Sequence, residues 1–415
     1  MALQGPVVVI AEKPAAGLVN ACGKAGAFPV IETRWAEALA ALTSIQPAAV
    51  IIAEPVPVDP NAIAAFVQQI ARAQPFVPVI VRVREDSELT FAGALPIGID
   101  EPTDRLIARL SAALRVRALH ETVLRRIATF ALEREPMPAL PANDPLEDAS
   151  VLVLGRGRSY PTLSVAVGER VSVIGALSVE AAGRCLNARE IDGIVIGDGF
   201  STRVIDAFLI VLAEDARFRD LAIGVLGDGV MPAEMPNIER GRDPIRLVER
   251  VLPFIRLHAF DARLKRMLKS LECKGMLDPE TGLLNIKAFG RDLTSAIDEA
   301  AERGAGLSIA RFSFDEALDR RTSLDVARVI SRLMRTVDFS CRQDDGSILT
   351  VFTSTDLRAA HVVVRRLASA LKHSMLPSEP DRPPVYPSIT LATLKPTDTI
   401  FTLMARVAPR MVAAE

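Results

Sequence analysis

The sequence lacks a long apolar run, paired cysteines and clustered histidines. Its four cysteines stand far apart without a C-x-x-C pair, so we expect reduced, mostly buried thiols. Four scattered histidines disfavour a histidine-built metal site. No apolar run reaches about 18 residues, and the N-terminal MALQGPVVVIAEK has no basic region before its apolar stretch. These absences indicate neither a membrane span nor a signal peptide, and they predict a cytoplasmic protein without a membrane partner.

An excess of charge of one sign is also missing. The 49 Lys and Arg residues are balanced by 51 Asp and Glu residues, which gives a net charge of -2. This balance argues against direct nucleic-acid binding by general positive charge, and a hydrophobic content of 49% argues against disorder. At roughly 100–200 residues per domain, the chain length predicts two to four domains.

The first hundred residues alternate short apolar runs with amphipathic helical stretches. The runs are rich in β-branched residues and too short for helices. Strands and helices that alternate at this spacing predict a parallel sheet of the flavodoxin-like kind, with helices on both faces. The expected strands cover residues 6–12, 28–33, 48–55, 76–83 and 95–99, with helical patterns at 34–45 and 61–73.

A long helix and a proline-rich stretch close this segment. The helical pattern runs from about Thr103 to Glu133, with leucines at helical spacing. Four prolines between Pro136 and Pro145 break any helix and indicate a linker. We therefore expect a first domain over residues 1–135 and a linker over 136–148. The apolar stripe of the long helix would also suit packing against a second subunit in a homodimer.

The second segment repeats the first. Apolar runs at 150–157, 170–176, 192–199 and 221–229 follow in the same order as before. The closing helices match more closely, because RLIARLSAALR and RLVERVLPFIR share four residues at a constant offset. A tandem duplication explains this agreement, and it predicts a second flavodoxin-like domain over residues 149–270.

The two copies resemble receiver domains of two-component response regulators. In that family an Asp ending the third strand accepts phosphate, acids after the first strand hold Mg²⁺, and a hydroxyl and a Lys complete the switch. In the first copy the acceptor position falls on Ala53 or Glu54. The hydroxyl position falls near Val83, and the Lys position on Glu101. Glu54 is either a solvated residue at a strand end, as Glu12 is, or a permanent phosphate mimic.

The second copy departs further from the receiver pattern. Its first strand is followed by Gly155-Arg156-Gly157-Arg158, which contains no acid. Asp198 lies beside the acceptor position, but it lacks the neighbouring carboxylates that would bind a hard cation. Asp198 is thus expected to be a solvated strand-end residue. We expect no phosphoacceptor and no metal site in either copy.

The third segment carries the most specific motif. Residues 278–285 read D-P-E-T-G-L-L-N and resemble the D-P-L-T-G-L-x-N start of GGDEF domains, the diguanylate cyclase family. Phe289 and an amphipathic helix through about Arg303 continue the likeness. The resemblance implies a nucleotidyl-cyclase-like α/β domain with an antiparallel or mixed sheet over residues 271–415. The whole chain is then similar to response-regulator diguanylate cyclases with two receivers.

The catalytic positions of that family are eroded. Ser313 stands where the first Asp of a D-x-D pair binds the metal, while Asp315 matches the second. A hydroxyl cannot supply the charge that Mg²⁺ needs, so we expect neither Mg²⁺ nor another cofactor. The GGDEF hairpin reads D-D-G-S-I, where Asp344 and Asp345 would repel a triphosphate. The stretch that binds GTP in the family has no counterpart. The resemblance therefore implies a pseudoenzyme.

One element of the family survives in register. Arg335-Thr336-Val337-Asp338 matches the R-x-x-D inhibitory motif, which lies five residues before the hairpin and binds cyclic di-GMP in family members. A guanidinium can donate to guanine O6 and N7, and a carboxylate can accept from N1–H and N2–H₂. Arg366, or its neighbour Arg365, stands where a second arginine usually completes the site. The alternative is an ordinary salt bridge at i,i+3 spacing.

These observations favour a non-catalytic, cytoplasmic cyclic di-GMP effector of bacterial second-messenger signalling. Its partners would be cyclic di-GMP, a second copy of the chain and a protein that the sequence does not name. One alternative is a protein-interaction scaffold that binds no nucleotide. Another is a diguanylate cyclase with residual activity.

Overall fold

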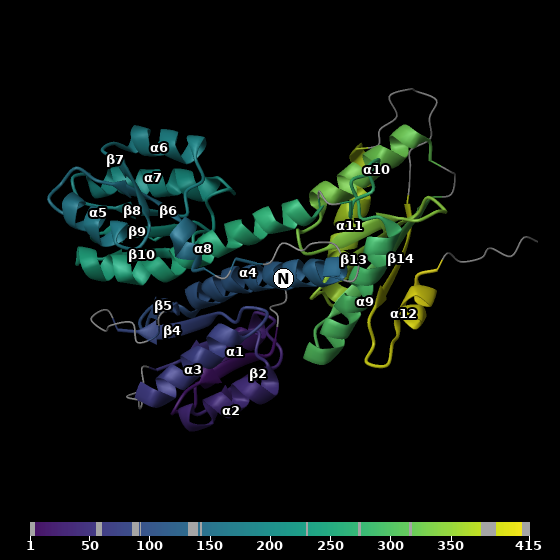
Figure 1. Cartoon of the computed structure of the whole chain (residues 1–415), viewed down its shortest axis with the longest axis horizontal. Coiled ribbons are helices and arrows are strands. Elements are labelled where there is room, and N and C mark those ends of the chain that lie inside the picture. The colour runs from purple at the N-terminus through teal and green to yellow at the C-terminus, as the bar shows by residue number, and fades with distance from the viewer. Residues whose placement is uncertain are drawn as a thin grey trace, which may run out of the picture. The chain divides into compact units, whose positions relative to one another are not determined.

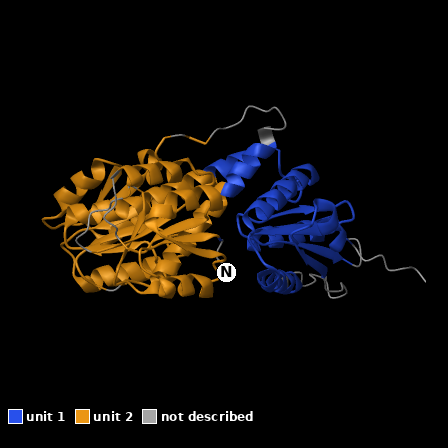
Figure 2. Cartoon of the chain, turned by 90° about the horizontal axis from the view of Figure 1, so that it is seen from below, with its two compact units in different colours: residues 1–5, 121–139, 266–415 blue, residues 6–120, 140–265 orange. Residues whose placement is uncertain are grey.

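The computed structural model describes most of the chain, which divides into two compact units (Figure 2). The tandem unit comprises residues 6–120 and 140–265, and the C-terminal unit comprises residues 1–5, 121–139 and 266–415. Within these ranges, the described residues exclude 1–4, 55–59, 85–90, 92, 132–139, 142, 230, 273–274, 315–317, 375–386 and 409–415.

The first sheet of the tandem unit is parallel, as predicted. Its strand order is β2-β1-β3-β4-β5, which is the order of flavodoxin-like sheets. Helices α2 (Trp35–Ile45) and α3 (Pro60–Arg72) cover one face, where Leu42 and Phe66 pack on Val8 and Ile10. The other elements are β1 (Val7–Ile10), α1 (Ala16–Lys24), β2 (Val30–Thr33), β3 (Ala49–Ile52), β4 (Val79–Val83) and β5 (Leu95–Gly98).

The second sheet of the tandem unit has the same topology (Figure 1). Its order, β10-β9-β8-β6-β7, becomes that of the first sheet when the strands are counted within the repeat. Strand β10 was not among the predicted strands. The elements are β6 (Ser150–Leu154), α5 (Tyr160–Gly168), β7 (Ser172–Ala176), α6 (Val179–Ala188), β8 (Gly193–Ile196), α7 (Thr202–Glu214), β9 (Ala222–Leu226) and β10 (Ile238–Gly241), with a 3-10 turn at Pro145–Asp148.

Two helices of 29 residues each follow the two sheets. Helix α4 spans Thr103–Ala131 and α8 spans Pro244–Glu272. The first residues of the two helices are separated by the same number of positions as their last residues, as a tandem duplication predicts. In the tandem unit these helices contact each other, because Arg109 lies over the ring of Phe254 at 4.8 Å. The rings of His120 and Phe260 also meet, at 5.1 Å. Side chains of the two long helices therefore meet within one chain, and the homodimer stays a prediction.

The C-terminal unit contains an antiparallel sheet in the order β12-β13-β11-β14, so the described sheets are two parallel and one antiparallel. The predicted D-P-E-T-G-L-L-N motif leads into helix α9, where the Asn285 side chain accepts from the Ala288 amide at 2.8 Å and caps the helix. The elements are α9 (Ile286–Arg303), β11 (Leu307–Phe314), α10 (Arg320–Leu333), β12 (Phe339–Arg342), β13 (Ile348–Thr353), α11 (Leu357–Ser374), β14 (Pro387–Thr393) and α12 (Ile400–Arg406).

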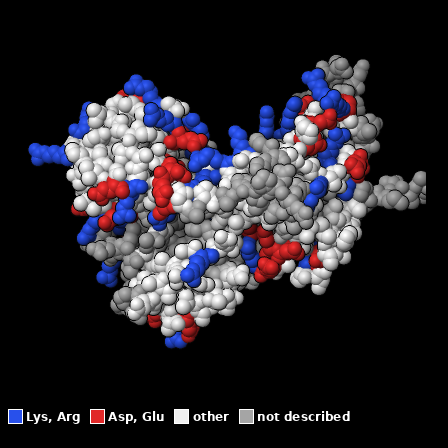
Figure 3. Space-filling view, in the orientation of Figure 1, with Lys and Arg blue, Asp and Glu red and all other residues white. Residues whose placement is uncertain are grey.

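The predicted domain boundaries stay a prediction, since the two compact units follow a different division. The last turns of α4 and α8 belong to the C-terminal unit, although both helices begin in the tandem unit. No helix in the described part of the chain is long and apolar enough to span a membrane. Figure 3 shows Lys and Arg side chains interspersed with Asp and Glu side chains on the face in view.

Candidate functional site

The hairpin predicted over residues 341–348 is present as antiparallel β12 and β13. In its loop, Arg311 of β11 donates from Nη1 to Asp345 Oδ2 at 2.9 Å, and the Ser347 amide donates to Asp345 Oδ1 at 2.9 Å. Arg311 therefore offsets the charge of Asp345. Asp344 is exposed beside it, so the predicted repulsion of a triphosphate rests on Asp344.

The predicted metal position is occupied by a neutral side chain. Ser313 is half-buried near the end of β11, opposite Ser388 of β14, and Asp315 lies outside the described residues. Among the residues that the structure describes, no three His, Cys, Asp or Glu side chains gather into a set that could hold a metal ion.

Arg335 and Asp338 form a bidentate ion pair in the turn between α10 and β12. Arg335 Nε donates to Asp338 Oδ2 at 2.9 Å, and Arg335 Nη2 donates to Asp338 Oδ1 at 3.0 Å. Nη2 also donates to the Thr355 hydroxyl at 2.7 Å and to the Thr353 carbonyl at 3.2 Å. The salt bridge that the sequence left open as an alternative is therefore present in the structure.

The fold uses both oxygens of Asp338. Besides Arg335, the Thr353 amide donates to Asp338 Oδ1 at 3.1 Å, which ties the turn to the end of β13. The Asp338 side chain is 1% exposed and that of Arg335 is 29% exposed. Burial raises the pKa of the Asp338 carboxyl, while the neighbouring guanidinium acts in the opposite direction. Burial of the Asp338 side chain keeps a ligand from its oxygens unless the turn moves, whereas Arg335 is already partly open to solvent.

Helix α11 brings a second arginine next to this turn. Arg366 Nη2 donates to the carbonyl of Leu333, the last residue of α10, at 3.0 Å. Leu333 lies two residues before Arg335, so Arg366 contacts the segment that leads into the turn. The joint role of Arg335 and Arg366 in a site stays a prediction. Arg365 is exposed on the same helix, but no contact of its side chain with the turn is seen among the described residues.

A cavity of about 200 Å³ opens beside the turn, within the C-terminal unit. It is bordered by the last turns of both long helices, by the loop before α9, and by the segment from the end of α10 into β12. The lining residues are Arg126, Glu272, Leu277, Gly282, Leu283, Leu284, Ser331, Met334, Arg335, Thr336, Asp338, Phe339 and Ser340.

Arg126 and Glu272 line this cavity, and neither was among the predicted site residues. Arg126 Nε lies 2.6 Å from Asp292 Oδ2 in an ion pair whose two side chains are 4% and 0% exposed. Its guanidinium also lies over the Phe339 ring, at 5.8 Å. Both residues are distant in sequence from the R-x-x-D motif. The sequence therefore offered one weak signal for them, a cation within the helical pattern of α4.

In the second repeat, the loop after β6 donates hydrogen bonds to Asp198. The backbone amides of Arg158 and Ser159 each donate to its carboxylate at 3.1 Å, and the Ser159 hydroxyl donates as well. The hydroxyl bond lowers the pKa of Asp198. A methyl group added at Gly157 would meet Asp198 Cγ at 2.3 Å. The expectation of a merely solvated Asp198 was wrong, because its carboxylate caps the loop that leads into α5.

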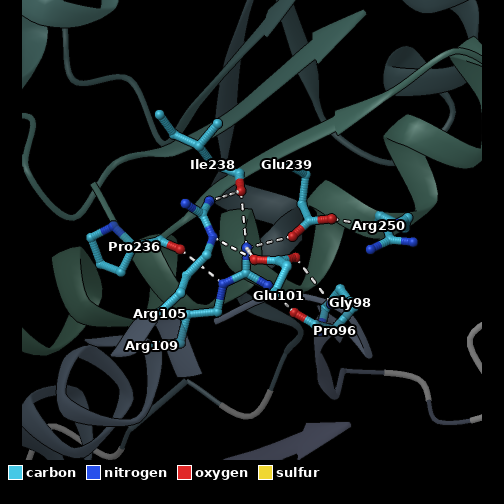
Figure 4. A network of polar contacts seen from close by, with 9 residues as sticks. All are labelled: Pro96, Gly98, Glu101, Arg105, Arg109, Pro236, Ile238, Glu239 and Arg250. Atoms are coloured by element: carbon cyan, nitrogen blue, oxygen red, sulfur yellow. Dashed lines mark hydrogen bonds and ion pairs between the residues drawn. The ribbon is translucent and has the colours of Figure 1, made fainter. Parts of the chain in front are cut away.

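The first repeat shows a similar use of its acids. Glu54 is exposed, whereas Glu12 Oε1 accepts from the Trp35 amide at 3.2 Å, at the start of α2. Glu101, at the Lys position, accepts from the Gly98 amide at 3.0 Å and lies 2.6 Å from Arg105 Nε (Figure 4). The acid at the Lys position thus pairs with an arginine of α4.

The same network joins the two repeats inside the tandem unit (Figure 4). Fully buried Arg109 lies 2.6 Å from Glu239 Oε1 of β10, and it donates to the carbonyls of Pro236 and Ile238 at 2.8 and 2.9 Å. Arg250, the duplicate of Arg109, donates from Nε to Glu239 Oε2 at 2.9 Å. One buried carboxylate therefore holds the equivalent arginines of both long helices.

Comparison with known proteins found no matching protein family and no curated relative. Among solved structures, the chain is similar to GGDEF domains over about a third of its length. These include the coiled coil and GGDEF domain of DgcB from Caulobacter crescentus in complex with c-di-GMP (21% identity, 35% of this chain and 83% of that chain, TM-score 0.31). A second is the diguanylate cyclase SiaD from Pseudomonas aeruginosa in complex with its activator SiaC (21% identity, 35% of this chain and 62% of that chain, TM-score 0.29). A third is the FimX GGDEF domain from Pseudomonas aeruginosa (17% identity, 32% of this chain and 88% of that chain, TM-score 0.29).

Proposed function

We propose that this chain is a non-catalytic effector that binds cyclic di-GMP in its C-terminal unit. The observation that supports the proposal is that Arg335 lines a cavity of about 200 Å³, while Arg366 donates to the carbonyl of Leu333, two residues before Arg335. Two guanidinium groups at one site suit a ligand with phosphates and guanine Hoogsteen edges.

The state of the cyclase remnants supports the non-catalytic part of the proposal. Ser313 supplies no charge for a metal ion, and the carboxylate of Asp345 is bonded to Arg311 and to the Ser347 amide. The receiver-like repeats would act as a scaffold without phosphorylation, because Asp198 already accepts three hydrogen bonds from the loop.

Titration calorimetry with cyclic di-GMP tests the proposal on the full chain. We expect Arg366→Ala to weaken binding about tenfold or more, since a hydrogen bond to a charged group is worth roughly 1.5–3 kcal/mol. Arg366 is exposed, so its removal should leave the fold intact. The matched control is Arg328→Ala on α10, an exposed arginine paired with Asp325. No heat with the wild type, or equal affinity in Arg366→Ala, would contradict the proposal.

A protein scaffold that binds no nucleotide is the second candidate. The full engagement of Asp338 favours it, because a purely structural R-x-x-D pair would have this geometry. Absence of binding in the calorimetry selects this candidate. Residual cyclase activity is the third, and we expect no cyclic di-GMP above a no-protein control after incubation with GTP and Mg²⁺ or Mn²⁺.

A further inference from the structure

The cavity beside the turn has the size of a base rather than of a whole dinucleotide. Its volume of about 200 Å³ compares with ~30 Å³ for one water in the liquid and with roughly 300–1,000 Å³ for sites of drug-sized ligands. Most of its lining surface is polar, and Leu277, Leu283 and Met334 are among the lining residues. The cavity therefore suits a ring whose edge carries several polar groups.

A buried cation on this cavity has an unused donor. The Arg126 side chain is 4% exposed, and its Nε pairs with Asp292. Among the described residues, no hydrogen-bond acceptor meets its buried Nη1. An unpaired buried donor is costly, so a rotation of the guanidinium that brings Nη1 to a ligand acceptor in the cavity would make a bond that the fold leaves unmade.

The carboxylates on the cavity differ in availability. Asp338 gives both oxygens to Arg335 and to the Thr353 amide. Glu272, at the last residue of α8, is half-buried, and no group of the described chain is seen to donate to it. Burial raises the pKa of Glu272, and the positive charge of Arg126 opposes that shift. Glu272 is thus the acid that can turn to a ligand without breaking the turn.

We propose that this cavity binds one guanine base of the ligand, with Arg126 donating to O6 or N7 and Glu272 accepting from N1–H and N2–H₂. This inference rests on the proposed function, and it assigns the reading of the base to the long helices instead of to Asp338. The complementary edges of guanine match one guanidinium and one carboxylate. Arg335 and Arg366 then face the phosphates or the second base.

Binding of a base by Arg126 and Glu272 would couple the ligand to both long helices, which begin in the tandem unit. Arg126 belongs to the last turns of α4 and Glu272 ends α8. A base held between them favours the arrangement of these helix ends that presents both side chains to the cavity. Ligand would therefore shift the population towards that arrangement by its difference in affinity.

Calorimetry with two ligands on the full chain tests the inference. Cyclic di-GMP is compared with cyclic di-IMP, which differs only in lacking both N2 amino groups. We expect the wild type to prefer cyclic di-GMP about tenfold or more, and Glu272→Gln to reduce this preference to about threefold or less. Arg126→Lys, which keeps a cation for Asp292, should weaken both ligands about tenfold. Thermal melting of each variant confirms the fold, and Arg328→Ala is the control.

The outcomes separate the two proposals. An unchanged preference in Glu272→Gln together with unchanged affinity in Arg126→Lys overturns the inference, and the proposed function stands if Arg366→Ala still loses binding. Weaker binding by Arg126→Lys and a reduced preference in Glu272→Gln, together with unchanged affinity in Arg366→Ala, would support the inference and contradict the assigned role of Arg366. A wild type that binds neither ligand overturns both.

Discussion

At the scale of single residues, Asp198 shows how an acid just after a strand can stabilise a neighbouring loop. Its carboxylate meets the loop after β6 where the backbone amides of Arg158 and Ser159 point at it. The bend of that loop depends on Gly157, since a side chain there would clash with Asp198. Sequence reasoning placed Asp198 near the acceptor position, but the closeness of this loop is a tertiary contact that strand patterns do not encode.

Replacing Asp198 should destabilise the tandem unit. Asp198→Ala removes the acceptor of the two amides, and a lost cap of this kind costs about 1 kcal/mol. Urea unfolding measures the loss, with Asp228→Ala as the control, because that acid pairs with Arg242 while both are largely exposed. Equal loss in the two variants would contradict the capping role.

His120 makes stability depend on pH. Burial lowers the pKa of His120 to about 4, with a further lowering from Arg117, and His120 Nδ1 accepts from the Phe76 amide at 3.0 Å. The unfolded state binds the proton near pH 6.5, so the stability that neutral His120 contributes is present above that pH and lost as pH falls towards 4. Urea midpoints of the wild type should drop over this window by more than those of His120→Gln. If the urea midpoints of the wild type and His120→Gln fell equally with pH, His120 would not be the cause of the pH dependence.

At the scale of elements, the periodic strands were predictable and β10 was not. Runs such as PVVVIAE are uniformly apolar because both faces of a parallel sheet are covered, and each predicted run contains a strand. In β10 the sequence reads I-E-R-G, so no apolar pattern marks it. Its Glu239 is 2% exposed because Arg109 and Arg250 neutralise it, which is a pairing across the duplication.

Breaking this pairing should be costly. Glu239→Ala leaves buried Arg109 without its carboxylate, and a buried pair broken from one side costs about 3–5 kcal/mol. Arg115→Ala is the matched control, since its pair with Asp220 is 43% and 49% exposed and should contribute less than about 1 kcal/mol. Urea unfolding compares the two variants, and similar losses would show that the network does not hold the repeats together.

At the scale of the whole molecule, the candidate site could be predicted only in part. The spacing of Arg335 and Asp338 from the hairpin is local in sequence, and α10 and α11 then place Arg366 beside them. Arg126 and Glu272 reach the same cavity from two helices that begin in the tandem unit, so only the folded chain reveals them. Both helices follow the two repeated sheets at equivalent places in the sequence.

The central claim is that cyclic di-GMP binds this chain through the arginines at the turn. The most direct measurement is titration calorimetry of the full chain with cyclic di-GMP, comparing the wild type with Arg366→Ala and with Arg328→Ala. We predict saturable heat for the wild type and Arg328→Ala, and at least about tenfold weaker binding for Arg366→Ala. No heat with the wild type, or the same affinity in all three proteins, would contradict the account.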